Sequence, residues 1–174
     1  MVELVTADGP DVVCLQELPV WAVARLAGWS GMHHFEAVTR PPLWPGPLST
    51  WVTRAHQGFF RSGLSGQANA ILVAPRHAAT DVGHERISEG GRERRVVHAV
   101  RIAGAPGVTI GNLHASNDFA RPEVPQAESA RAAAFVEGSS NAAGSNAAIV
   151  PRSAWTESAL RSAARRSLRL TLNV

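Results

Sequence analysis

Two polar positions stand where apolar runs of the sequence end, and their side chains are of types that carry out chemistry. In "DVVCLQE" an apolar run leads directly into Glu17, whose carboxylate is the hard oxygen ligand that suits a cation such as Mg²⁺. In "VTIGNLHAS" a second run leads into Asn112 and His114, which a strand places on one face by its period of two. An imidazole there can act as a general acid or orient a phosphate. Each position alone also fits an ordinary solvated strand end.

The hydrophobic period around these positions predicts alternating strands and helices. We predict strands over residues 12–16, 32–38, 67–74, 79–87, 94–103 and 108–116. We predict helices over residues 1–7, 19–29 and 122–138, the second with Pro19 at its first position and Gly28 near its end. Residues 39–58 carry four prolines and two tryptophans, which is typical of a long surface loop.

Composition limits the possible classes of protein. The chain has 174 residues, of which 45% are hydrophobic, so it is long enough for one domain with a core. Its lone cysteine, Cys14, excludes an internal disulfide framework and lies in an apolar run, as a small core residue would. No apolar stretch reaches the roughly 20 residues of a membrane span, and we expect a cytoplasmic protein.

The character of the chain changes after Gly138. Residues 139–150, "SSNAAGSNAAIV", are small and polar, and we predict a flexible linker there. Residues 151–174 form a helix-compatible, arginine-rich tail that carries the excess positive charge. Its only acidic residue is Glu157, and its arginines are Arg152, Arg161, Arg165, Arg166 and Arg169.

The ordered series "DVVCLQE", "GQANAIL", "ERRVVHAV" and "VTIGNLHAS", followed by a helix with Gln126 and Arg131, resembles the endonuclease/exonuclease/phosphatase family. The resemblance covers about residues 1–138, and its most specific parts are Leu-Gln-Glu and Asn-Leu-His. It implies the α/β class and a partial four-layer α/β sandwich of the deoxyribonuclease-I-like fold, with mainly antiparallel or mixed sheets flanked by helices. It also implies a metal-dependent phosphoric ester hydrolase.

The resemblance implies a role for each candidate residue. Glu17 matches the family's metal-binding glutamate, with Mg²⁺ as the cofactor and Mn²⁺ as its alternative. His114 matches the catalytic histidine that contacts the scissile phosphate. Arg95 matches a phosphate-binding arginine, a role that Arg94 could also take, and Asn112 falls beside the substrate phosphate. The substrate would be a phosphorylated compound, with nucleic acid as one candidate.

The sequence also departs from the family pattern. Family members carry an asparagine at the end of a strand that precedes the first helix, and the given sequence begins after that point. The family motifs Gly-Asp-Phe-Asn and Ser-Asp-His do not occur in it. Asn69 falls where the family has Gly-Asn-Ala, but "QANAIL" indicates a residue at the start of a strand. We therefore expect residues 1–138 to be an incomplete domain of a truncated or degenerate member, whose activity as written is in question.

Other functions remain open. The alternative is a non-catalytic fragment that binds nucleic acid or another acidic partner through its arginine-rich tail. Histidines 33, 34, 56, 77 and 84, with Glu85, match no zinc spacing, so solvated or core histidines are favoured over a transition-metal site. A serine hydrolase is disfavoured, because "SGLSG" lacks the glycine spacing of a nucleophile elbow.

Overall fold

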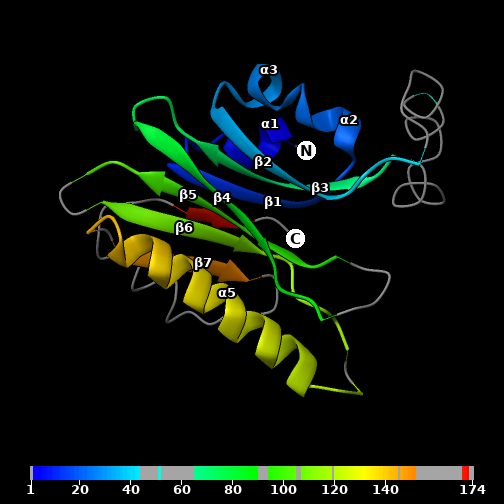
Figure 1. Cartoon of the computed structure of the whole chain (residues 1–174). Coiled ribbons are helices and arrows are strands. Elements are labelled where there is room, and N and C mark those ends of the chain that lie inside the picture. The colour runs from blue at the N-terminus through cyan, green and yellow to red at the C-terminus, as the bar shows by residue number, and fades with distance from the viewer. Residues whose placement is uncertain are drawn as a thin grey trace.

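The described part of the molecule consists of four layers, with two β-sheets packed face to face between two layers of helices (Figure 1). The computed structural model describes residues 2–43, 51, 65–89, 94–104, 107–118, 120–144, 146–151 and 170–172. The α/β sandwich with mixed sheets that the resemblance implied is confirmed.

The first sheet has the order β2-β3-β1-β8. Its strands are β1 (Val12–Leu18), β2 (His33–Arg40), β3 (Gln67–Val73) and β8 (Leu170–Leu172). The β1–β3 and β2–β3 pairs are antiparallel, whereas β8 runs parallel to β1. The outer face is covered by the short helices α1 (Val2–Thr6), α2 (Val20–Val23) and α3 (Leu26–Ser30).

The second sheet has the order β4-β5-β6-β7. Its strands are β4 (Ala79–Arg86), β5 (Val96–Ile102), β6 (Val108–Leu113) and β7 (Asn146–Pro151). The first two pairs are antiparallel and β7 is parallel to β6. Helix α5 (Glu123–Asn141) covers its outer face.

Strand alternation divides the core into three layers. In β1, Val13 and Leu15 face the short helices, while Val12 and Cys14 face the second sheet. In β6, Ile110 faces the first sheet and the odd-numbered positions face α5. Even-numbered residues at the ends of β1 and β6 therefore look into the space between the sheets.

Gly111 lets helix α5 lie close against β6. A Cβ atom added at Gly111 would stand 2.5 Å from Val136 Cγ2 on α5. Since real Cβ contacts are longer, any other residue here would require Val136 or the helix that carries it to shift. The absence of a side chain at Gly111 thus lets α5 lie close to β6, which ends at Leu113, directly before His114.

Three local predictions need correction. The helix predicted over residues 19–29 is two short helices, and the second continues past Gly28 to a left-handed cap at Gly31, where φ is 65°. The flexible linker predicted over 139–150 instead contains the end of α5 and most of β7. Within the predicted tail, Leu170–Leu172 form a strand that pairs with β1, while most of the predicted loop and residues 152–169 lie outside the described residues.

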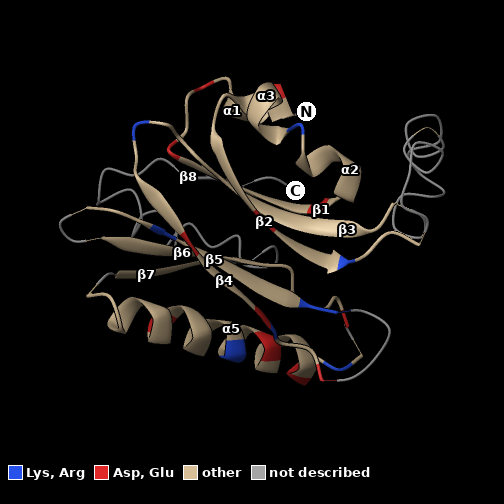
Figure 2. Ribbon diagram, turned by 45° about the horizontal axis from the view of Figure 1, so that its top comes forward, with Lys and Arg blue, Asp and Glu red and all other residues tan. Residues whose placement is uncertain are grey.

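The interior is mainly apolar, and the charged residues lie mainly at strand ends and along α5 (Figure 2). Cys14 is 3% exposed, and burial raises the pKa of its thiol to about 12. That confirms its place in the core and makes it a poor nucleophile. Among the described residues, no helix is both long and apolar enough to cross a bilayer.

Candidate functional site

Glu17 and His114 lie side by side where β1 and β6 end. Glu17 Oε1 is 3.5 Å from His114 Nε2, although the two residues are far apart in the sequence. The Glu17 side chain is 47% exposed, whereas that of His114 is 11% exposed. A carboxylate that solvent can reach therefore stands against a largely enclosed imidazole, at the edge of the layer between the two sheets, which we call the mouth.

A β-bulge gives Glu17 its position. Leu15 pairs with Ala70 and Leu18 with Ala68, so two residues of β1 lie opposite one residue of β3. In a regular strand Glu17 would follow Val13 and Leu15 toward the helices, but Leu18 takes that face instead. Glu17 has a φ of 56°, and no other described residue except glycine has a positive φ.

Such a conformation costs a residue with a side chain roughly 1–2 kcal/mol. Strain of this kind is concentrated at functional sites, where it aims a side chain that regular structure would bury. The backbone at Glu17 is thus an indication of function that residue types alone do not carry.

Asn112 is enclosed beneath this pair. It is 0% exposed, and its Nδ2 donates to the backbone oxygens of Leu15, at 2.9 Å, and Ala70, at 3.0 Å. Its Oδ1 accepts from Gln16 Nε2 at 3.0 Å. The predicted face is right, but these bonds join the two sheets, so a phosphate-binding role for Asn112 stays a prediction that the geometry does not favour.

The loop after His114 is fixed by a buried carboxylate that the sequence analysis did not single out. Glu128 on α5 is 2% exposed. Its Oε2 accepts from the Ser116 amide at 2.6 Å, and its Oε1 accepts from Ser116 Oγ at 2.8 Å. Since Ser116 is two residues beyond His114, the helix holds the chain that follows the imidazole.

Arg95 lies just before β5, with its backbone joined to the end of β4. Its amide donates to Ser88 Oγ at 3.1 Å, and its carbonyl accepts from the Ile87 amide at 3.0 Å. Arg131 of α5 binds the same segment, through the Ile87 carbonyl and through Glu89 Oε1 at 2.6 Å. The phosphate-binding role of Arg95, and the alternative at Arg94, stay predictions.

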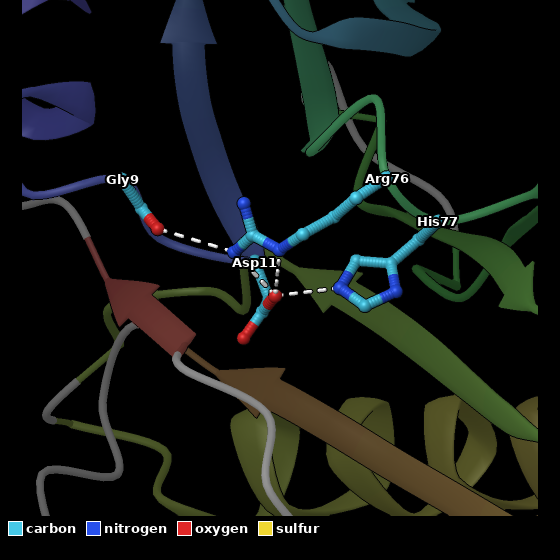
Figure 3. Close-up of polar contacts among 4 residues, drawn as sticks. All are labelled: Gly9, Asp11, Arg76 and His77. Atoms are coloured by element: carbon cyan, nitrogen blue, oxygen red, sulfur yellow. Dashed lines mark hydrogen bonds and ion pairs between the residues drawn. The ribbon is translucent and has the colours of Figure 1, made fainter.

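A second polar cluster lies at the opposite end of β1 (Figure 3). Asp11 Oδ1 accepts from Arg76 Nε at 3.0 Å, from Arg76 Nη2 at 2.5 Å, and lies 2.5 Å from His77 Nε2. Arg76 Nη2 also donates to the Gly9 carbonyl at 3.2 Å. The Asp11 side chain is 8% exposed, so this cluster closes the start of the strand.

The histidine alternative gains no support from the described part of the chain. No group of three or more His, Cys, Asp or Glu side chains there is arranged to hold a metal ion. His77 is engaged by Asp11, and His84 stands opposite His98 on neighbouring strands. His56 lies outside the described residues.

The residues at the mouth fit a Mg²⁺ ion that keeps most of its water ligands. Mg²⁺ is held in many proteins by one or two carboxylates together with water and substrate phosphate. Glu17 supplies one half-exposed carboxylate, and neighbouring Gln16 has a buried Oε1 with no hydrogen-bond partner among the described residues. This donor set suits a hard cation with most ligands from solvent and substrate.

Comparison with known proteins gives matches in structure but not in sequence. No protein-family model matches the chain, and no curated protein matches it either. Among solved structures, ANGEL2, described as a 2′,3′-cyclic phosphatase, aligns with a TM-score of 0.62 and 12% identity, covering 86% of this chain and 41% of that one. The human Nocturnin catalytic domain with bound sulfate aligns with a TM-score of 0.58 and 14% identity, covering 95% and 60%.

A protein described as endonuclease/exonuclease/phosphatase from Beutenbergia cavernae aligns with a TM-score of 0.50 and 21% identity, covering 78% of this chain and 37% of its own. The chain therefore spans between 37% and 60% of the length of these three proteins. At these identities the likeness shows the fold. The chain has the deoxyribonuclease-I-like fold of the endonuclease/exonuclease/phosphatase proteins.

Proposed function

We propose that this chain is a Mg²⁺-dependent phosphoesterase, or carries the half-site of one, with Glu17 and His114 as its functional pair. The observation that carries the proposal is the contact at 3.5 Å between Glu17 Oε1 and His114 Nε2. It joins the ends of two strands from different sheets, and one of its members sits in a strained backbone conformation. The likeness in fold to a 2′,3′-cyclic phosphatase supports the same class of reaction.

In the proposed mechanism Glu17 would hold the cation, which would supply positive charge to neutralise the phosphoryl oxygens of the substrate. Exposure of 47% leaves the Glu17 carboxylate accessible to the cation and to the substrate. His114 meets the substrate phosphate from the enclosed side and donates a proton toward the departing oxygen. Its low exposure keeps water from competing for that hydrogen bond.

Two requirements of hydrolysis have no assigned residue in the described part of the chain. The orientation of the attacking water and a second carboxylate for the cation are not supplied by Glu17 or His114. We therefore expect slow turnover compared with proteins of the fold that are about twice as long. The substrate is proposed only as a phosphoric ester, with nucleic acid as one candidate.

The proposal is tested by measuring hydrolysis in buffers of defined metal content. Purified chain is incubated with bis(para-nitrophenyl) phosphate, para-nitrophenyl phosphate and a single-stranded oligonucleotide, each with Mg²⁺, Mn²⁺ or EDTA. We expect turnover with the metals, none with EDTA, and a loss of about 10²–10⁴-fold in His114→Gln, the usual contribution of a general acid. Glu17→Gln should raise the metal concentration needed for half-maximal rate.

The matched controls are Glu85→Gln and His84→Gln, which change exposed side chains of the same types on β4. They should leave turnover unchanged. Equal rates in wild type and Glu17→Gln at limiting metal, or no metal-dependent hydrolysis of any substrate, would rule out the phosphoesterase. Salt-sensitive oligonucleotide binding that disappears on deletion of residues 151–174, without hydrolysis, would instead favour the non-catalytic alternative.

A further inference from the structure

A pair of amide side chains joins the two sheets directly behind the candidate site. Gln16 Nε2 donates to Asn112 Oδ1 at 3.0 Å and to the Leu113 carbonyl at 2.7 Å. Asn112 Nδ2 donates in turn to the carbonyls of Leu15 and Ala70. We call the side chains of Gln16 and Asn112 the inter-sheet clamp.

The clamp acts one residue away from each member of the functional pair. Gln16 immediately precedes Glu17, and Leu113, whose carbonyl it binds, immediately precedes His114. The Leu15 carbonyl bound by Asn112 is the last backbone acceptor before the bulge. The four hydrogen bonds therefore fix the strand ends of both sheets at the two points from which Glu17 and His114 project.

The surroundings of the clamp indicate that its polar side chains do more than stabilise the fold. Away from the end that carries the clamp and His98, the layer between the sheets is built from apolar side chains such as Cys14, Ile71 and Ile110. Two amides there, Asn112 buried and Gln16 partly buried, gain little net stability, since each must recover the hydrogen bonds that it made with water. Apolar residues of the same size would hold the sheets together about as well, but they would not define a register between them.

We propose that Gln16 and Asn112 are positioning residues, which set the separation of Glu17 and His114 without touching the substrate. This inference rests on the proposed function for its effect on turnover. Loss of the clamp leaves both side chains in place but lets the sheets shift against each other. A displacement of about 1 Å at a reacting pair can cost about 10²-fold in rate.

The test replaces both amides with apolar side chains of similar size, in Gln16→Met/Asn112→Leu. Replacing both partners together leaves neither amide unpaired, but it removes one hydrogen bond each from the carbonyls of Leu15, Ala70 and Leu113, so the free energy of unfolding should fall moderately. The control is Thr109→Val, which replaces a polar side chain by an apolar one. Thr109 lies on β6, the strand that carries Asn112, and is likewise 0% exposed. Urea unfolding establishes that all variants are folded.

Two readouts are then compared. The first is hydrolysis, where we expect kcat to fall by about 10²-fold in the double variant with KM nearly unchanged. The second is the broadening of the His114 imidazole NMR signals by Mn²⁺, which reports the distance between the cation and His114 without any turnover. We expect strong broadening in the wild type and Thr109→Val, and weak broadening in the double variant.

These readouts separate the two proposals. If the wild type shows Mn²⁺ broadening but no hydrolysis, the phosphoesterase proposal fails, and loss of broadening in the double variant still supports the clamp. If the double variant matches Thr109→Val in both kcat and broadening, the clamp is only structural and the inference is wrong. Absence of broadening in the wild type overturns both, because no cation then lies beside His114.

Discussion

The two ends of β1 each carry an acidic residue, and the structure treats the two carboxylates in opposite ways. At the start of the strand, Asp11 is 8% exposed and is bound by Arg76 and His77 (Figure 3). At its end, Glu17 is 47% exposed and faces His114 at a distance longer than a good hydrogen bond. Asp11 sits in ordinary backbone, whereas Glu17 has a positive φ.

The difference separates a stabilising carboxylate from one that is available for chemistry. Asp11 joins the start of β1 to the turn between β3 and β4, through a side chain 65 residues away in sequence. Glu17 is held out from its strand by a bulge, at a cost in backbone strain, and keeps an accessible face. A carboxylate kept accessible in this way can exchange ligands, which the enclosed Asp11 cannot do.

The largest expected difference in stability is between Asp11→Ala and Glu17→Ala. Removing Asp11 leaves Arg76 and His77 without their carboxylate partner. Breaking a buried pair costs about 3–5 kcal/mol, but Arg76 is 53% exposed and becomes solvated, so we expect about 2 kcal/mol. Glu17→Ala should stay within about 0.5 kcal/mol of the wild type in urea unfolding.

The exposed Glu85→Ala serves as the reference for loss of a surface carboxylate. Hydrolysis by the folded fraction should be lost in Glu17→Ala and kept in Asp11→Ala. If Glu17→Ala were as destabilising as Asp11→Ala, both carboxylates would be structural and the contrast between the two ends of β1 would disappear.

A smaller effect is expected from relieving the strain at Glu17. Glycine adopts a φ of 56° without steric cost, while alanine pays nearly the same penalty as glutamate. Glu17→Gly should therefore have a free energy of unfolding about 1 kcal/mol higher than that of Glu17→Ala. Both variants lack the carboxylate, so the comparison isolates the backbone.

The same two substitutions at Glu85, in the regular part of β4, provide the control. Glycine there should be less stable than alanine by about 0.5–1 kcal/mol, because a regular strand gains nothing from glycine's freedom. A glycine variant at position 17 that is also less stable than its alanine counterpart would show that Glu17 is not strained.

Much of the fold could be predicted because its signal is local. The apolar runs in "DVVCLQE" and "VTIGNLHAS" predicted β1 and β6, and the period of two predicted that Asn112 and His114 share a face. The contact of Glu17 with His114 followed from the resemblance, since two residues so far apart give no local signal of proximity. The prediction of their roles is not tested by their positions alone.

The rest depends on contacts that the sequence does not display. The strand β7, "NAAIVP", is rich in small residues, and its pairing with β6 is what makes it a strand. The bulge at Glu17 could not be predicted, since glutamate has no preference for a positive φ. The clamp did leave a signal, because Gln16 and Asn112 are polar residues at inward positions of otherwise apolar runs.

The smallest expected effect concerns His98, which faces the space between the sheets as His114 does but is 0% exposed. Burial lowers the pKa of His98, while Asp81, whose Oδ1 is 3.0 Å from His98 Nε2, acts in the opposite direction. His84 lowers the pKa of His98 further and Glu36 raises it. The enclosed imidazole is therefore neutral over a wider pH range than a free one.

The sign of the pH dependence follows from this direction. The unfolded chain takes up a proton at His98 near pH 6.5, before the folded chain does, so this residue makes the protein less stable as the pH falls below about 6.5. In urea unfolding between pH 7.5 and 5.5, the decline should be shallower in His98→Gln than in the wild type. His33→Gln, which changes an exposed histidine on β2, should keep nearly the wild-type slope. Equal slopes in the wild type and His98→Gln would mean that His98 takes up its proton equally well in the folded chain, and that the space between the sheets is open to water beyond the mouth where His114 lies.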